Sequence, residues 1–145
     1  MSARSTSSTA YSGTPLPRKL GLQPGTTLAW VDAPVAPEAL LGPLPESVRV
    51  RESLRGHADL VVCFVTERAV LARRVGVLRR VVAPDGAAWV AWPKRSSGVA
   101  TDVTEDVVRE LALPTGLVDV KVCAIDATWS GLKLVVRREL RGSGA

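Results

Sequence analysis

The chain has 145 residues, of which 46% are hydrophobic and 23% charged, and it carries a net charge of +5 at pH 7. This length suits one domain with its own core, and the composition excludes an intrinsically disordered chain. No apolar run approaches the roughly 18 residues of a transmembrane helix, and the opening "MSARSTSSTAYSG" lacks the hydrophobic stretch of a secretory signal. We expect a cytoplasmic protein with a disordered tail at residues 1–10, one domain over 11–141 and a C-terminal tail at 142–145.

The first half of the chain alternates short helix-forming segments with apolar segments of strand length. In chain order we expect a helix over residues 16–20, a strand over 26–34, a helix over 36–42 and strands over 47–53 and 58–65. Pro37 suits the first turn of the second helix. Alternating Val and Arg in "SVRVRES" indicate an edge strand with one wet face, whereas the continuously apolar "ADLVVCFV" predicts a strand buried on both faces.

A longer helix should follow, with Thr66 as its N-cap. One apolar stripe marks it, formed by Leu71, Val75, Leu78 and Val82. A Pro-Asp-Gly turn at residues 84–86 then leads into the strand "AAWVAWPK".

The last helix is expected to begin at Asp102, which forms a capping-box-like pair with Glu105. Its apolar face should consist of Val103, Val107 and Leu111. Two strands, "LVDVKVCAID" and "LKLVVRREL", are joined by the short segment "ATWSG", which predicts an antiparallel hairpin. Strands that alternate with helices imply an α/β fold with a mostly parallel sheet and helices on both faces.

Four segments carry a resemblance to known proteins: "YSGTPLPRKLG", "VVCFVTER", "WVAWPKRSSGVATDVTEDVVRE" and "LPTGLVDVKVCAIDATWSGLKLVVRRE". Through them residues 11–140 resemble a family of short bacterial proteins catalogued as domain of unknown function 3052. Residues 59–139 also resemble the C-terminal half of the class I methyltransferase fold. The resemblance implies a truncated, Rossmann-like sheet of about six strands whose last strand inserts antiparallel between its neighbours, and it implies no known activity.

The segment after the first strand is where a nucleotide or S-adenosylmethionine site would be expected in this class. Such sites use glycines there, so that the backbone approaches the ligand closely. Here "WVDAPVAPEAL" has no G-x-G, and Pro34 and Pro37 lack N–H donors. We therefore expect no cofactor, although Asp32 and Glu52 could mimic parts of a ribose site, which keeps open an atypical S-adenosylmethionine-dependent methyltransferase.

The strand ending at Pro93 and the final hairpin supply the candidate binding residues. In the methyltransferase arrangement both segments reach the carboxyl edge of the sheet, where open α/β sheets bind ligands. We predict that one concave patch there is formed by Trp92, Lys94, Ser97, Trp129, Ser130 and Lys133. Half-exposed indoles would supply stacking area and the nearby lysines would select an anionic group. The alternative is that the two indoles seal the end of the core.

Neither metal chemistry nor catalysis is indicated by the remaining residues. Cys63 and Cys123 lie in apolar runs outside any C-x-x-C pair and are expected to be free thiols, and His57 is the single histidine. The arginines are spread along the chain without stacking aromatics between them, which makes nucleic-acid binding a weaker alternative. We expect a non-catalytic binding or interaction module whose partner is a small anionic molecule or another protein.

Overall fold

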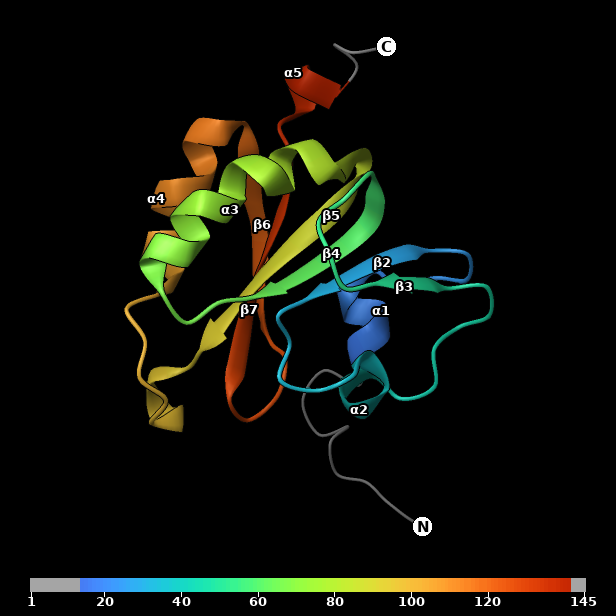
Figure 1. Ribbon diagram of the computed structural model, residues 1–145, viewed down its shortest axis with the longest axis horizontal. Helices are drawn as coiled ribbons and strands as arrows, with labels where there is room; N and C mark the ends of the chain where they lie inside the picture. The colour runs from blue at the N-terminus through green and yellow to red at the C-terminus, as the bar shows by residue number, and fades with distance from the viewer. Residues whose placement is uncertain (1–13, 142–145) are drawn as a thin grey trace.

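The computed structural model describes residues 14–141, so the tails expected at residues 1–10 and 142–145 lie outside the described part of the chain. One six-stranded sheet, ordered β3-β2-β4-β5-β7-β6, forms the centre of the molecule (Figure 1). Its strands are β2 (Thr27–Val31), β3 (Arg49–Arg51), β4 (Ala58–Phe64), β5 (Val82–Pro93), β6 (Leu117–Ala124) and β7 (Trp129–Val136).

The strand directions confirm the predicted α/β sheet. β2, β3, β4 and β5 run parallel to one another, while β7 runs antiparallel to both β5 and β6. β3 lies at one edge of the sheet, as its alternating sequence indicates, and β4 is buried along most of its length. The final hairpin therefore inserts its last strand between β5 and β6.

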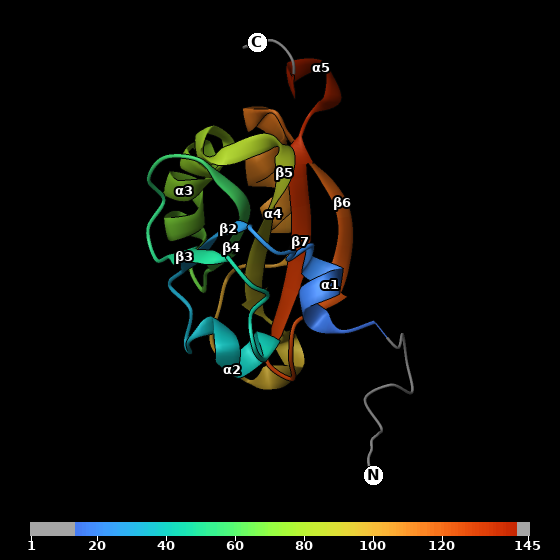
Figure 2. The same cartoon turned by 90° about the vertical axis from the view of Figure 1, so that its right-hand side faces the viewer.

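Helices cover both faces of this sheet (Figure 2). They are α1 (Leu16–Leu20), α2 (Pro37–Leu41), α3 (Arg68–Val81), α4 (Glu105–Ala112) and the terminal α5 (Arg138–Arg141), with single 3₁₀ turns η2 (Arg95–Ser97) and η3 (Leu113–Thr115). On one face, Leu71, Leu78 and Val108 bring α3 and α4 against the strands. On the other face, Leu20 and Leu41 do the same for α1 and α2.

Two predicted helix caps are wrong. The N-cap of α3 is Glu67 rather than Thr66, and its side chain makes no cap hydrogen bond. Instead the carboxylate of Asp102 accepts a hydrogen bond from the backbone N–H of Arg68 at 2.6 Å. α4 is capped by Thr104, whose hydroxyl accepts from the N–H of Val107. Asp102 thus stabilises the start of a helix other than the one it precedes in sequence.

The predicted turn at residues 84–86 is instead an irregular part of β5. α3 ends at Val81 and β5 begins at the next residue. The register between β4 and β5 then shifts, because Ala58 pairs with Val82 whereas Leu60 pairs with Ala87. A Cβ on Gly86 would lie 2.4 Å from the carbonyl oxygen of Asp59. Glycine is needed here because the two backbones approach too closely for any side chain.

Candidate functional site

The carboxyl ends of β2 and β4 form the position where this fold class holds ligands. β2 connects through α2 to β3 on one side of it, and β4 lies on its other side. The order of strands therefore reverses between β2 and β4. Asp32 directly follows β2 and has a positive φ of 56°, which short polar side chains tolerate better than most. Its carboxylate pairs with the guanidinium of Arg74 from α3 at 2.6 Å. An ion pair between two partly exposed side chains thus joins the end of β2 to α3.

The loop after β2 is held against the sheet by a tryptophan. The indole N–H of Trp30 donates to the carbonyl of Val35 at 2.8 Å, and the Trp30 side chain is buried. Pro37 occupies the start of α2, after a residue that gives no side-chain cap. With Pro34 also lacking an N–H, the loop offers few of the backbone donors that a glycine-rich phosphate loop presents.

Cys63 of β4 lies near this ion pair but is not an activated nucleophile. Burial raises the pKa of its thiol to about 11, and the neighbouring Arg74 only partly opposes that shift. A thiol with such a pKa is almost wholly protonated at neutral pH, and the thiolate is the reactive form. The Cys63 thiol is therefore not a prepared nucleophile.

The predicted patch at the carboxyl edge does not exist as one surface. The strand ends do meet there, because Pro93 pairs with Trp129 and Trp92 pairs with Ser130 across β5 and β7. However, Trp92 is buried in the cluster beneath α3 and α4, whereas Trp129 packs against the cluster on the opposite face. Lys133 pairs with Trp89, further from the carboxyl edge. The prediction that all six side chains converge is wrong, because adjacent residues of a strand point to opposite faces.

The basic loop after β5 uses its own polar groups to hold its turn. The hydroxyl of Ser97 donates to the carbonyl of Lys94 at 2.7 Å and accepts from the N–H of Val99 at 3.2 Å. The N–H of Lys94 donates to the carbonyl of Thr128 in the hairpin turn at 2.7 Å. These bonds give the Ser97 hydroxyl a structural role in the turn and tie the loop to the hairpin.

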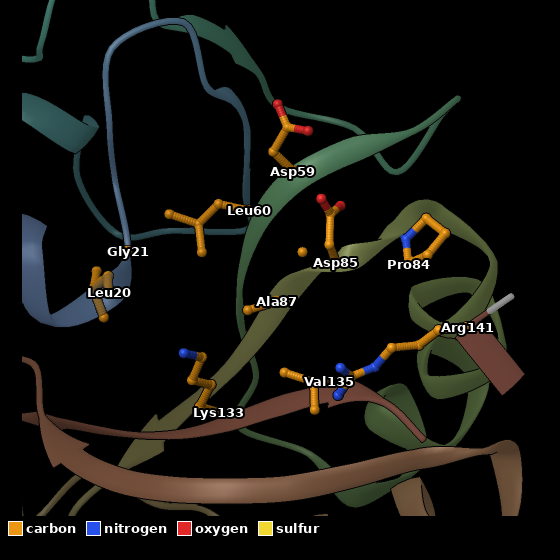
Figure 3. Close-up of a pocket in the computed structure, with 11 residues that line it drawn as sticks. Leu20, Gly21, Asp59, Leu60, Pro84, Asp85, Ala87, Lys133, Val135 and Arg141 are labelled. Atoms are coloured by element: carbon orange, nitrogen blue, oxygen red, sulfur yellow. The ribbon is translucent and has the colours of Figure 1, made fainter. Parts of the chain in front are cut away.

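A cavity of about 300 Å³ opens at the opposite, amino-terminal edge of the sheet (Figure 3). Its charged lining residues come from separate elements: Asp59 from β4, Asp85 from β5, Lys133 from β7 and Arg141 from α5. No sequence motif joins these four positions, so inspection of the sequence missed the cavity. Only Lys133 was among the predicted site residues, and it lies here rather than with Trp92 or Trp129.

No protein-family model and no curated protein matches the chain. Solved structures do match it. An S-adenosylmethionine-dependent methyltransferase from Aquifex aeolicus superposes with a TM-score of 0.58 at 15% identity, covering 83% of this chain and 88% of that one. Magnesium protoporphyrin IX methyltransferase from Synechocystis PCC 6803, with bound SAH, gives 0.53 at 11% identity over 79% and 74%. A TehB-like methyltransferase from Corynebacterium glutamicum gives 0.51 at 13% identity over 90% and 93%.

These similarities define the class of the fold: it is the Rossmann-like fold of class I methyltransferases. The residues after β2 do not fit a cofactor held by a glycine-rich loop, because prolines and the Asp32–Arg74 ion pair stand where bare backbone would be needed. Within residues 14–141, no group of three or more His, Cys, Asp or Glu side chains is placed to hold a metal ion. Nor does that part of the chain include a helix with the length and apolarity for a membrane span.

Proposed function

We propose that this chain is a non-catalytic binding module built on a class I methyltransferase-like scaffold. The observation that carries the proposal is the ion pair between Asp32 and Arg74, which joins the end of β2 to α3 where a cofactor of this fold class would bind. The hydrogen bond from Trp30 to Val35 supports it, because it fastens the adjoining loop to the sheet. A cofactor would have to displace interactions that the protein already makes.

Calorimetric titration with S-adenosylmethionine and S-adenosylhomocysteine tests this proposal. We expect no measurable heat of binding at about millimolar ligand, which corresponds to a binding free energy weaker than about −4 kcal/mol. Arg74→Ala removes the ion pair, and Arg73→Ala, on an exposed neighbouring residue of α3, is its matched control. A micromolar dissociation constant for the unaltered chain would overturn the proposal.

A methyltransferase with an atypical cofactor site is the second candidate. Solved structures with bound SAH or SAM are among those that match this fold, which favours it. Asp32 directly follows β2 and Glu52 directly follows β3, so both carboxylates lie at strand ends that could face a ribose. The same titration separates the two candidates, since transfer of a methyl group requires the donor to bind.

We further propose that the chain belongs to the family catalogued as domain of unknown function 3052, on the four sequence segments that resemble it. The partner of such a module would be a small molecule with an anionic group or another protein. Nucleic-acid association is a weaker third candidate, supported only by the net charge of +5. Binding driven by counterion release alone would fall steeply between about 50 and 200 mM salt, whereas a retained RNA or duplex preference would contradict this ranking.

A further inference from the structure

The cavity at the amino-terminal edge of the sheet has a charged rim above buried apolar side chains. Leu20, Leu60 and Ala87 line it from the core beneath α1, and all three are buried. Asp59, Asp85, Lys133 and Arg141 also line it. Polar groups that converge on a concavity fix the orientation of a small ligand there.

The charges of the rim are separated by sign. Figure 3 shows the carboxylates of Asp59 and Asp85 on the side formed by β4 and the start of β5, with Lys133 extending from β7 across the cavity. Arg141 reaches in from α5, with its guanidinium near Val135. The rim has two negative and two positive groups, so its net charge is zero. A ligand with a single charge would therefore be attracted by two of these groups and repelled by the other two.

These opposite charges do not pair with each other. Among residues 14–141, no ion pair joins any of the four rim groups. Asp59 accepts a hydrogen bond from the backbone N–H of Thr27 at 2.9 Å, and Arg141 donates to the carbonyl of Val136 at 2.8 Å. Asp85 and Lys133 make no side-chain hydrogen bond within the described residues. Asp85 and Lys133 are thus opposite charges of the rim that no ion pair within the described residues neutralises.

An irregular stretch of β5 backbone around Gly86 forms part of the cavity wall. Gly86 lies in the irregular part of β5, where its backbone approaches the carbonyl of Asp59 too closely to allow a Cβ. Irregularities of this kind redirect side chains and are common beside binding sites. This one sets Asp85 beside Asp59 at the rim, as Figure 3 shows.

We propose that this cavity binds a small zwitterion of the amino-acid class, with a primary ammonium group and a carboxylate. The ammonium group lies against Asp59 and Asp85, and the carboxylate lies against Lys133 and Arg141. An aliphatic side chain or methylene chain lies against Val135 and Pro84, which line the cavity and are not buried. The inference deepens the proposed binding function and rests on it, because it names the ligand class of the module.

Titration of the full chain, followed by the backbone amide NMR signals of Gly21 and Gly86, tests this site. The probes are glycine, 4-aminobutanoate, 6-aminohexanoate and L-leucine, which differ in charge separation and apolar length. The controls are 4-methylpentanoate, which lacks the ammonium group, and isopentylamine, which lacks the carboxylate. We expect at least one zwitterion to saturate these shifts below about 10 mM, and both controls to bind at least about tenfold more weakly.

Two substitutions locate the site. Lys133→Ala and Asp85→Asn should each weaken binding of the best zwitterion by about 10-fold or more, because each removes a charged hydrogen-bonding partner. Lys121→Ala is the matched control, since Lys121 pairs with Lys133 across β6 and β7 but does not line the cavity. Thermal unfolding of each variant checks that it is folded.

Failure of all four zwitterions to saturate, equal binding of a singly charged control, or unchanged affinity in both cavity variants would overturn the inference. These failures are distinguishable from failure of the proposed function. S-Adenosylmethionine binding would refute the non-catalytic role through a site at the carboxyl ends of β2 and β4, which is the other edge of the sheet. A negative result with the zwitterions alone does not change the result of the S-adenosylmethionine titration.

Discussion

Trp92 and Trp129 lie on opposite faces of the sheet, although they are within one residue of pairing across β5 and β7. Trp92 pairs with Ser130, and Pro93 pairs with Trp129. Directly paired residues point to the same face of a sheet, and neighbouring residues of one strand point to opposite faces. This register therefore places the two indoles on opposite faces. Each indole therefore belongs to a different core cluster.

Truncating the two tryptophans should have unequal effects. Trp92 is 7% exposed beneath α3 and α4, so Trp92→Ala should lower the free energy of unfolding by about 3–5 kcal/mol. Trp129 is only partly buried, and its ring contacts that of Phe64 edge-to-face with the ring centroids 5.0 Å apart. Trp129→Ala should cost about 1–3 kcal/mol. Urea denaturation of both variants measures this, and a larger loss for Trp129→Ala would contradict the placement.

Removing the Asp102 carboxylate should destabilise α3 rather than α4. Its hydrogen bond to the N–H of Arg68 acts as an N-cap supplied from a distant segment. Asp102→Ala should cost about 0.5–2 kcal/mol and speed hydrogen exchange in the first turn of α3. Thr104→Ala is the matched control, because Thr104 caps α4 through Val107. If Asp102→Ala speeds hydrogen exchange in α4 and leaves exchange in α3 unchanged, the local capping box is supported instead.

Acid should weaken the contact between α4 and β6. The Arg109 guanidinium lowers the pKa of the Asp119 carboxyl in the folded state through a 2.8 Å hydrogen bond. A lowered folded pKa stabilises the protein above the unfolded value of about 3.9, and this stability is lost as pH falls through the folded pKa. Asp119→Asn should therefore reduce the unfolding free energy at about pH 7 and have a shrinking effect below about pH 4.

The control for this experiment is Asp106→Asn. Asp106 is 97% exposed and contacts the same Arg109 at 3.5 Å. Its substitution should change the pH dependence much less than Asp119→Asn does, because exposed ion pairs contribute little. Equal pH profiles for the two variants, measured by urea titration at each pH, would show that the Asp119 contact has no special role.

Alkylation should distinguish the two cysteines. Burial raises the pKa of Cys63 to about 11, and it also raises the pKa of the partly buried Cys123. With iodoacetamide at about pH 8, Cys123 should react first, and Cys63 should react only when the chain unfolds. Mass spectrometry of the labelled peptides gives both rates. Rapid labelling of Cys63 in the folded protein would contradict its burial and would reopen the question of a reactive thiol.

The order and type of the main elements could be predicted from the sequence, because local patterns encode them. Pro37 marks the first turn of α2, and the alternation around Val50 marks an edge strand. The apolar run of β4 indicates a strand buried on both faces, and the short connection near Thr128 indicates the hairpin. Each signal depends on residues a few positions apart, within the period of a helix or a strand.

The tertiary structure alone decided which side chains meet. The face of Trp129 depends on the register between β5 and β7, and a shift of one residue would reverse it. Asp102 reaches α3 across 34 positions of sequence, which no capping pattern contains. The cavity brings together Asp59, Asp85 and Lys133 from three strands. Sequence patterns specify the period and the ends of an element, whereas register and packing between distant segments place one side chain beside another.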